Sequence, residues 1–312
     1  MSEGDIYERL IDAASVVDGL HPHTRVLHAK GTWCEGTFTA TEEATGLSRA
    51  QIFSGEEVPV LVRISNAPGK PTSHDATRAG RGLAVKLRPN GPGGEGETDI
   101  LATTTTVFLA RNAEDFLELL EARRPDPETG EPDMEKLGAY LGAHPEAQTS
   151  IQQTLGSEPP ASFATIPFYS PHAFKLVDAD GNGTWIRYRW RPEAGEQRIS
   201  DDEARERGRD YLVEELSDRL AKGPAVFTLL FQVAEDGDVI EDPTDAWPDE
   251  RRLLEAGRLE LTKVIDDPEQ GDHIEVFDPT RVGDGIELSD DPILHARKGA
   301  YSVSAYHRLG TA

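Results

Sequence analysis

The sequence predicts an α+β protein built on a closed antiparallel β-barrel of about eight strands, with helices surrounding it. Runs rich in β-branched residues recur along most of the chain, and glycine-rich turns separate them. Several amphipathic stretches interrupt this series. The 312 residues suffice for one large core, and no repeat or low-complexity linker marks a boundary. We therefore expect a single domain over residues 1–312, with a short N-terminal helix within residues 1–20.

The expected strands share an alternating or β-branched pattern bounded by turn residues. They are residues 25–40, 58–65, 81–88, 98–110, 172–190, 224–234 and 257–265. Within them, DADGNG (178–183) begins like an EF-hand calcium loop. Such a loop needs glutamate at its twelfth position, where Arg189 stands, and helices rather than strands on both sides. A hairpin turn is therefore favoured over a calcium site.

The expected helices have apolar residues at helical spacing and recognisable ends. They are residues 3–17, 112–124, 133–144, 145–155 and 199–223. Asn112 is suited to cap the second of these. The last has the strongest pattern, with Ser200 as a cap and Gly223 as a stop.

Charge and cysteine content exclude several classes of protein. The formal net charge is −25, which argues against nucleic acid or anionic membranes as partners because like charges repel. Cys34 is the single cysteine, so no intrachain disulfide can form and a reducing compartment is expected. The acidic N-terminus lacks the apolar core of a signal peptide, and no run of about eighteen apolar residues occurs. The sequence thus predicts a cytoplasmic protein.

Two segments concentrate titratable side chains. HTRVLHAKG (23–31) contains two histidines, an arginine and a lysine on what is expected to be an extended run, and HARKGAYSVSAYHRLG (295–310) places Arg297 four residues before Tyr301. On a helix these two share a face, and a guanidinium beside a phenol favours the phenolate, a known axial ligand of haem iron. The same pattern fits a plain hydrogen bond in a protein without haem.

Several separated blocks then share order and approximate spacing with one known family. The chain, from about residue 20 to residue 310, resembles the monofunctional haem catalases. Besides the two segments above, the blocks are VRISN (62–66), TRAGRGLAVK (77–86), TDILATTTTVFLARN (98–112), YSPHAFKLVDADG (169–181) and FDPTRVGDGIELSDDPILHAR (277–297). The large enzymes have a long N-terminal arm and a C-terminal helical or flavodoxin-like region, and we expect this protein to have neither. It is therefore most similar to the small catalase-related peroxidases, with a catalase-type barrel as the expected fold.

The resemblance assigns roles to individual residues. His28 matches the distal histidine that takes a proton from the peroxide and returns it to the far oxygen, and Ser65 the residue that fixes its tautomer. Tyr301 matches the iron ligand. The other positions that match haem-binding residues are Arg25, Arg63 and Arg308 (propionates), Arg297, His172 and Asp291 (the network behind the tyrosine) and Phe116 (a ring near the distal pocket).

Two positions depart from the family pattern. Thr103 stands where catalases have a distal asparagine, whose amide donates to the peroxide, and losing one such donor typically slows a step by about a hundred- to a thousandfold. Ala79 stands where the family has an aspartate that lines the peroxide channel. Asn66 is nearby in sequence and could supply a substitute amide. These departures disfavour efficient dismutation of hydrogen peroxide.

The resemblance therefore implies a haem-dependent peroxidase with haem b, which reduces hydrogen peroxide or organic hydroperoxides through a ferryl intermediate and has weak catalase activity. Its partners are a peroxide and a small organic electron donor, and a homo-oligomer is compatible with the sequence. Three alternatives stay open. They are a true small catalase, an enzyme that rearranges a lipid hydroperoxide or oxidises a biosynthetic substrate, and a non-enzymatic haem protein for storage or sensing. A bare scaffold without haem is disfavoured because Tyr301 and Arg297 are both present.

Overall fold

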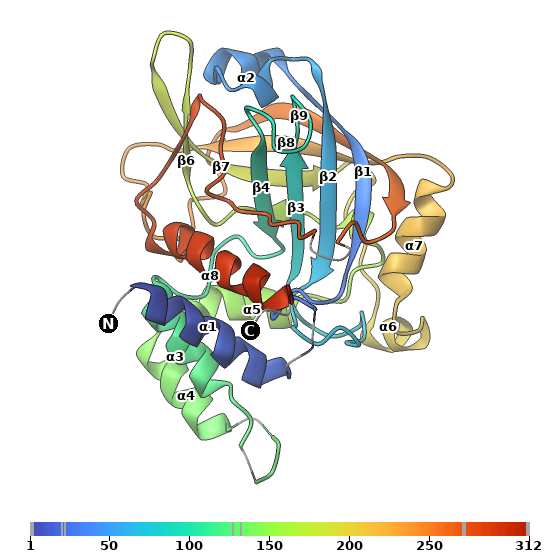
Figure 1. Ribbon diagram of the computed structural model, residues 1–312, viewed down its shortest axis with the longest axis vertical. Helices are drawn as coiled ribbons and strands as arrows, with labels where there is room; N and C mark the ends of the chain where they lie inside the picture. Colours follow the sequence, from blue (N-terminus) through green and yellow to red (C-terminus); the bar gives the residue numbers. More distant parts are fainter. Residues whose placement is uncertain are drawn as a thin grey trace.

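A closed ring of antiparallel strands forms the centre of the computed structural model, which describes residues 3–19, 21, 23–126, 128–131, 133–269 and 273–309. Neighbours in the ring follow the order β7-β5-β4-β3-β2-β1-β9-β8, and pairing of β8 with β7 closes it, so eight strands form the barrel (Figure 1). These strands are β1 (Gly31–Ala40), β2 (Glu57–Asn66), β3 (Arg81–Leu87), β4 (Thr98–Thr103), β5 (Phe168–Tyr169), β7 (Gly183–Pro192), β8 (Ala225–Val233) and β9 (Leu253–Ile265). The predicted barrel is confirmed.

Two further strands extend the sheet outside the ring. β6 (Phe174–Val177) pairs with β7, and β10 (Ile286–Leu288) pairs with β6. The inside of the barrel is a packed apolar core, in which Trp190 packs edge-on against Phe38 and both side chains are fully buried. Because side chains alternate along each strand, the residues between these core positions lie on the outer face of the barrel.

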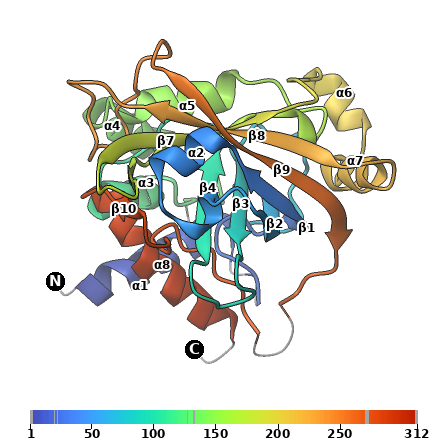
Figure 2. The same cartoon turned by 90° about the horizontal axis from the view of Figure 1, so that it is seen from above.

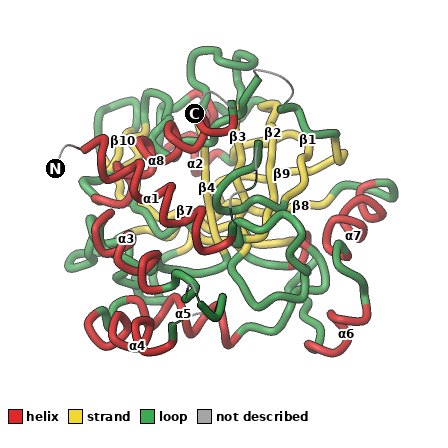
Figure 3. Tube along the Cα trace, turned by 60° about the horizontal axis from the view of Figure 1, so that its bottom comes forward, coloured by secondary structure: helices red, strands yellow, loops and turns green. Residues whose placement is uncertain are grey.

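Helices cover one side of that outer face. α1 (Glu3–Asp18), α3 (Ala113–Ala122), α4 (Met134–Ala143), α5 (Ala147–Gly156) and α8 (Pro292–Arg308) gather there (Figures 1 and 3). α6 (Asp201–Glu206) and α7 (Tyr211–Leu220) lie on a different side, where α7 packs on β9, and α2 (Glu42–Leu47) lies at one end of the barrel (Figures 1 and 2). Among the described residues, no helix is long and apolar enough to cross a membrane.

The first and last helices pack against each other although they are far apart in sequence. Leu10 and Ala14 of α1 are buried against Leu120 of α3, and α1 also lies along α8. The approach is close at Gly299, where a Cβ atom would collide with the ring of Tyr7. Residues from both ends of the chain thus border the same space beside the barrel.

Most predicted elements are confirmed, including the caps at Asn112 and Ser200, whose side chains accept from backbone N–H groups in the first helical turn. The region 199–223 forms two helices instead of one, because Gly208 adopts a left-handed φ of 82° between them. The run 172–190 is a hairpin of β6 and β7 joined by the DADGNG turn, which confirms the turn prediction. The run 98–110 is a strand only to Thr103.

The prediction of an extended run from residue 25 was wrong, since β1 begins at Gly31. The backbone N–H groups of His28 and Ala29 donate to the carbonyls of Ala67 and Pro68 in a loop instead of joining a strand ladder. His28 also has a φ of 56°, which interrupts any extended conformation. This irregular backbone sets the direction of the histidine side chain.

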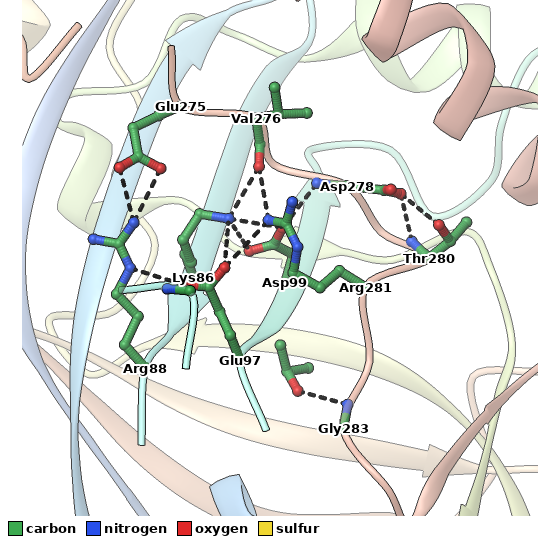
Figure 4. A network of polar contacts seen from close by, with 12 residues as sticks. Lys86, Arg88, Glu97, Asp99, Glu275, Val276, Asp278, Thr280, Arg281 and Gly283 are labelled. Atoms are coloured by element: carbon green, nitrogen blue, oxygen red, sulfur yellow. Dashed lines mark hydrogen bonds and ion pairs between the residues drawn. The ribbon is translucent and has the colours of Figure 1, made fainter. Parts of the chain in front are cut away.

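A buried charge network fastens the segment that follows β9 to the barrel (Figure 4). Lys86 of β3 donates to Asp99 of β4 at 2.8 Å, and both side chains are fully buried. Arg281 donates to the same carboxylate at 2.7 Å. Lys86 and Arg281 also donate to the carbonyl of Val276, at 3.0 and 2.9 Å. Paired and fully hydrogen-bonded charges of this kind hold the segment in one place.

Candidate active site

A cavity of about 250 Å³ lies between the outer face of β2, β3 and β4 and the helices α1, α3 and α8. Most of its lining is apolar, with a few convergent polar groups, as is usual for a ligand site. The predicted site residues that line it are Arg25, His28, Arg63, Ser65, Thr103, Phe116, Arg297, Tyr301 and Arg308. The two remaining predicted residues, His172 and Asp291, are fully buried behind this lining.

Strand register builds one wall of the cavity. Gly31, Ser65, Gly82 and Thr103 are direct partners across β1, β2, β3 and β4, so they form one row on the outer face of the sheet. The imidazole of His28 lies against this row, because a Cβ atom at Gly82 would come within 2.9 Å of its Cε1. A glycine in the middle of a strand often marks such a close approach. The absence of a side chain at Gly82 thus makes room for the histidine.

The hydrogen bonding and charge of His28 suit a proton acceptor. Its Nδ1 and the hydroxyl of Ser65 are 3.0 Å apart, which leaves Nε2 available on the cavity side. Burial, followed by the positive charge of Arg63, lowers the pKa of His28 to about 3. The imidazole is therefore neutral across the physiological range. A left-handed backbone at a histidine is uncommon and is found preferentially at functional sites.

Thr103, on this wall, has its hydroxyl engaged by a neighbour, and Asn66 and Ala79 lie away from the cavity. The hydroxyl of Thr103 donates to the carbonyl of Thr105 at 3.1 Å and lies equally close to the Thr105 hydroxyl. The suggestion that Asn66 supplies a substitute amide was wrong. Asn66 follows Ser65 on β2 and so faces the opposite side of the sheet, where its amide donates to the buried Asp75 at 2.7 Å. Ala79 lines a separate cavity of about 20 Å³.

The opposite wall holds a chain of hydrogen bonds that ends at Tyr301. Arg297, one turn earlier on α8, donates to the phenolic oxygen through Nε at 3.0 Å and Nη2 at 2.6 Å. Its Nη1 donates to Nε2 of His172 at 2.9 Å, since a guanidinium can only donate. Nδ1 of His172 must then carry the proton, which it donates to Asp291 at 2.6 Å.

Burial keeps His172, in the middle of this series of hydrogen bonds, in one protonation state. It lowers the pKa of His172 and outweighs the carboxylate of Asp291, so the imidazole is neutral. Asp291 also accepts from the backbone of Ile293 and Leu294, and so caps the helix that carries Tyr301. The same carboxylate therefore orients the helix and the histidine behind the arginine.

The three arginines predicted to bind carboxylates meet at the rim of the cavity. Arg25 and Arg308 both bind the carboxylate of Glu269, and Arg63 donates to the carbonyl of Ala29. In the part of the chain that the structure describes, Nε of Arg63 and Nε of Arg308 are buried without a hydrogen-bond partner. Unpaired buried donors are rare, and two beside an apolar cavity fit an anionic ligand.

Sequence reasoning missed several residues of the site. Gly82 could have been noticed as a glycine within a strand pattern. Leu10, Ile11 and Ala14 of α1 line the cavity, but their spacing signals only an amphipathic helix. Nothing in the sequence marks Glu269, because its role depends on where the segment after β9 lies.

A second cluster, Asp115, His144 and Glu146, brings three ligand atoms within 4.8 Å of one another. Arg111 forms ion pairs with both carboxylates, at 3.3 and 3.1 Å, so a positive charge already lies beside this group. We assign no metal to it.

Comparison with known proteins assigns the chain to a family. Residues 9–312 match the family model described as Catalase. The chain belongs to the catalase family. Among curated relatives, a catalase-related peroxidase of Mycolicibacterium paratuberculosis is 38% identical, with 99% of this chain and 97% of the relative covered. A catalase-related peroxidase of Synechococcus elongatus is 32% identical, with 95% and 87% covered.

Solved catalase structures share the fold. A fungal catalase superposes with a TM-score of 0.81 at 25% identity, and catalase A from Saccharomyces cerevisiae with a TM-score of 0.80 at 25% identity. Each match covers 92% of this chain but only 60% and 61% of the catalase chains. Membership of the catalase family implies a haem cofactor, and the unpaired arginine donors, the apolar lining and the doubly hydrogen-bonded Tyr301 fit that group.

Proposed function

We propose that this protein is a haem peroxidase that reduces hydrogen peroxide or organic hydroperoxides with electrons from a small organic donor, and that its catalase activity is weak. That it is an oxidoreductase acting on peroxide follows from its family and from the named activity of its relatives. The observation that supports the peroxidase over the catalase is the Thr103 hydroxyl, which donates to Thr105 beside the distal histidine.

Tyr301 would hold the iron of a haem, and Arg25, Arg63 and Arg308 its propionates. When bound, the haem would supply the redox centre at which the peroxide bond is cleaved. Arg297 donates twice to the Tyr301 oxygen, and a phenolate oxygen, which has three lone pairs, would accept both hydrogen bonds and still have one lone pair for a metal. The neutral imidazole of His172 accepts from Arg297 and is itself held by the carboxylate of Asp291, which keeps Arg297 in this position.

His28 would act as the general base and acid. Ser65 fixes its ring through Nδ1, and Nε2 can accept the peroxide proton and return it to the departing oxygen. Because the pKa of His28 lies near 3, the imidazole carries no extra proton at neutral pH, so its second ring nitrogen is not blocked by one. Gly82, which has no side chain, leaves room for the ring against the sheet.

Dismutation requires more hydrogen-bond donors beside His28 than peroxidase turnover does. A second peroxide must be oriented while it gives up its protons and electrons, and an amide donor in the position of Thr103 would help to orient it. The Thr103 hydroxyl already donates to Thr105 in the loop that follows β4. A small organic electron donor does not have to be oriented in this way, because an electron can be transferred from a loosely bound molecule.

The finer features of the proposal follow from the same reasoning. The cofactor is haem b, the whole of residues 1–312 forms one domain, and the protein works in the cytoplasm. Its charge of −25 makes nucleic acid an unsuitable partner. A true small catalase is the second candidate, because His28 and Ser65 keep the geometry that proton transfer needs.

One experiment separates the two candidates. The purified protein is loaded with haem, its absorption spectrum is recorded, and oxygen release on addition of hydrogen peroxide is compared with oxidation of an added phenol. A high-spin ferric spectrum with rapid phenol oxidation and little oxygen supports the peroxidase. The same spectrum with vigorous oxygen release would replace it by the catalase. Failure to acquire a haem band after reconstitution would refute both.

A further inference from the structure

Glu269 occupies the arginines that the proposed function assigns to the haem propionates. It lies four residues after the end of β9, and its carboxylate binds Arg25 through two hydrogen bonds, of 2.8 and 2.9 Å. Nη1 of Arg308 donates to the same carboxylate at 2.6 Å. Only about a tenth of the Glu269 side chain is exposed. This is a bidentate, charge-assisted contact of the stronger kind, not a loose surface ion pair.

The contact uses the donors that a propionate would need. Both terminal nitrogens of Arg25 bind Glu269, and Nη2 of Arg25 also donates to the carbonyl of Glu275. A second carboxylate cannot approach that end of Arg25 in bidentate fashion while Glu269 remains. It would also meet the negative charge of Glu269 at close range. Buried donors without a partner are left at Nε of Arg63 and of Arg308.

Glu275, six residues after Glu269, is firmly anchored. Glu275 binds Arg88 through both carboxylate oxygens, at 2.8 and 3.0 Å, within the charge network of Figure 4. The N–H of Glu275 donates to Glu269 at 2.9 Å. Glu275 is thus tied to the residue that follows β3, whereas the Glu269 side chain is held by this N–H and the two arginines. Release of Glu269 leaves the charge network intact.

We infer that Glu269 is a built-in carboxylate competitor for the propionate site, which haem must displace from Arg25 and Arg308 before it is fully bound. This inference rests on the proposed haem site. In haem-free protein, Glu269 pairs with Arg25 and Arg308 and so offsets part of the positive charge of a cluster of three arginines that burial would otherwise destabilise. The exchange depends on the charge of the propionates, because an uncharged ester cannot replace the Glu269 carboxylate at the two arginines.

The test measures binding, not turnover. The haem-free full-length chain is titrated with ferric haem and, separately, with the dimethyl ester of haem, which has no propionate charge. Absorption changes and quenching of tryptophan fluorescence report binding. The variants are Glu269→Gln, Glu269→Ala and, as the matched control, Glu287→Gln, which breaks an exposed ion pair with Lys175. Circular dichroism checks that each variant is folded.

Glu269→Gln and Glu269→Ala are expected to bind ferric haem at least about tenfold more tightly than the wild type, the size of one charge-assisted hydrogen bond regained. The dimethyl ester should bind all four proteins equally, and Glu287→Gln should behave like the wild type. Equal or weaker haem binding by the Glu269 variants would overturn the inference but leave the haem site standing. If none of the proteins binds haem, the proposed function fails with it.

Discussion

Protonation of His28 gives the sharpest test of the distal site. Burial and Arg63 lower its pKa to about 3, from the usual value of 6.5. At pH 5 a histidine of ordinary pKa is neutral in only about 3% of molecules, whereas His28 would be neutral in about 99%. In haem-loaded enzyme, the rate of reaction with hydrogen peroxide, followed by stopped-flow absorption, should therefore stay level down to about pH 4. A rate that falls with a midpoint near pH 6.5 would refute this account.

The same shift affects stability. Below pH 6.5 the unfolded chain binds a proton at His28 that the folded chain refuses until about pH 3, so stability is fully present above pH 6.5 and falls below it. Between pH 7 and pH 5 this one residue removes about 2 kcal/mol from the free energy of unfolding. His28→Asn is the matched variant, because asparagine tolerates the left-handed backbone.

Urea unfolding of haem-free wild type and His28→Asn at the two pH values isolates the effect, since other groups titrate alike in both proteins. The wild type should lose about 2 kcal/mol more than the variant on acidification. Parallel losses would mean that folded His28 accepts a proton as readily as an exposed histidine does.

Three other predictions concern the remaining parts of the structure. Tyr301→Phe should abolish haem loading or remove the tyrosinate features of the absorption spectrum, and an unchanged spectrum would exclude this residue as the iron ligand. Thr103→Asn should raise the ratio of oxygen release to phenol oxidation by at least about tenfold, because it restores a distal amide donor. No rise would mean that another group already orients the peroxide. Lys86→Met should lower the free energy of unfolding, measured in urea, by about 3–5 kcal/mol, because it removes one of the two cations that pair with the buried Asp99. A smaller loss would show that Arg281 alone compensates the charge.

Local rules were sufficient where an element depends on its own residues. The alternation of β2 and β3, the cap at Asn112 and the turn between β6 and β7 all follow from side chains within a few positions. The same rules misplaced the start of β1. Whether residues 25–30 join a strand depends on the loop at Ala67 and Pro68, whose carbonyls accept from the N–H groups of His28 and Ala29.

The family resemblance predicted more of the site than local sequence rules did, because it relates residues from segments that are far apart in the chain. It named eleven candidate residues, and the structure gathers nine of them at the cavity, with His172 and Asp291 behind Arg297. It could not show that Asn66 points away, since facing is set by strand register. It could not show that the acceptor of the Thr103 hydroxyl is the carbonyl of Thr105.

By itself, the sequence determined the strand and helix pattern, the acidic charge and the identity of the residues that can do redox-linked proton chemistry. Tertiary structure decided which of those groups are free to act. The row from Gly31 to Thr103 exists only because four strands align. The pKa of His28 is low because the folded chain buries it and brings Arg63, which is far away in sequence, close to it. Glu269 reaches Arg25 across 244 residues of chain. Contacts between residues so far apart in sequence are created by folding, and no local pattern encodes them.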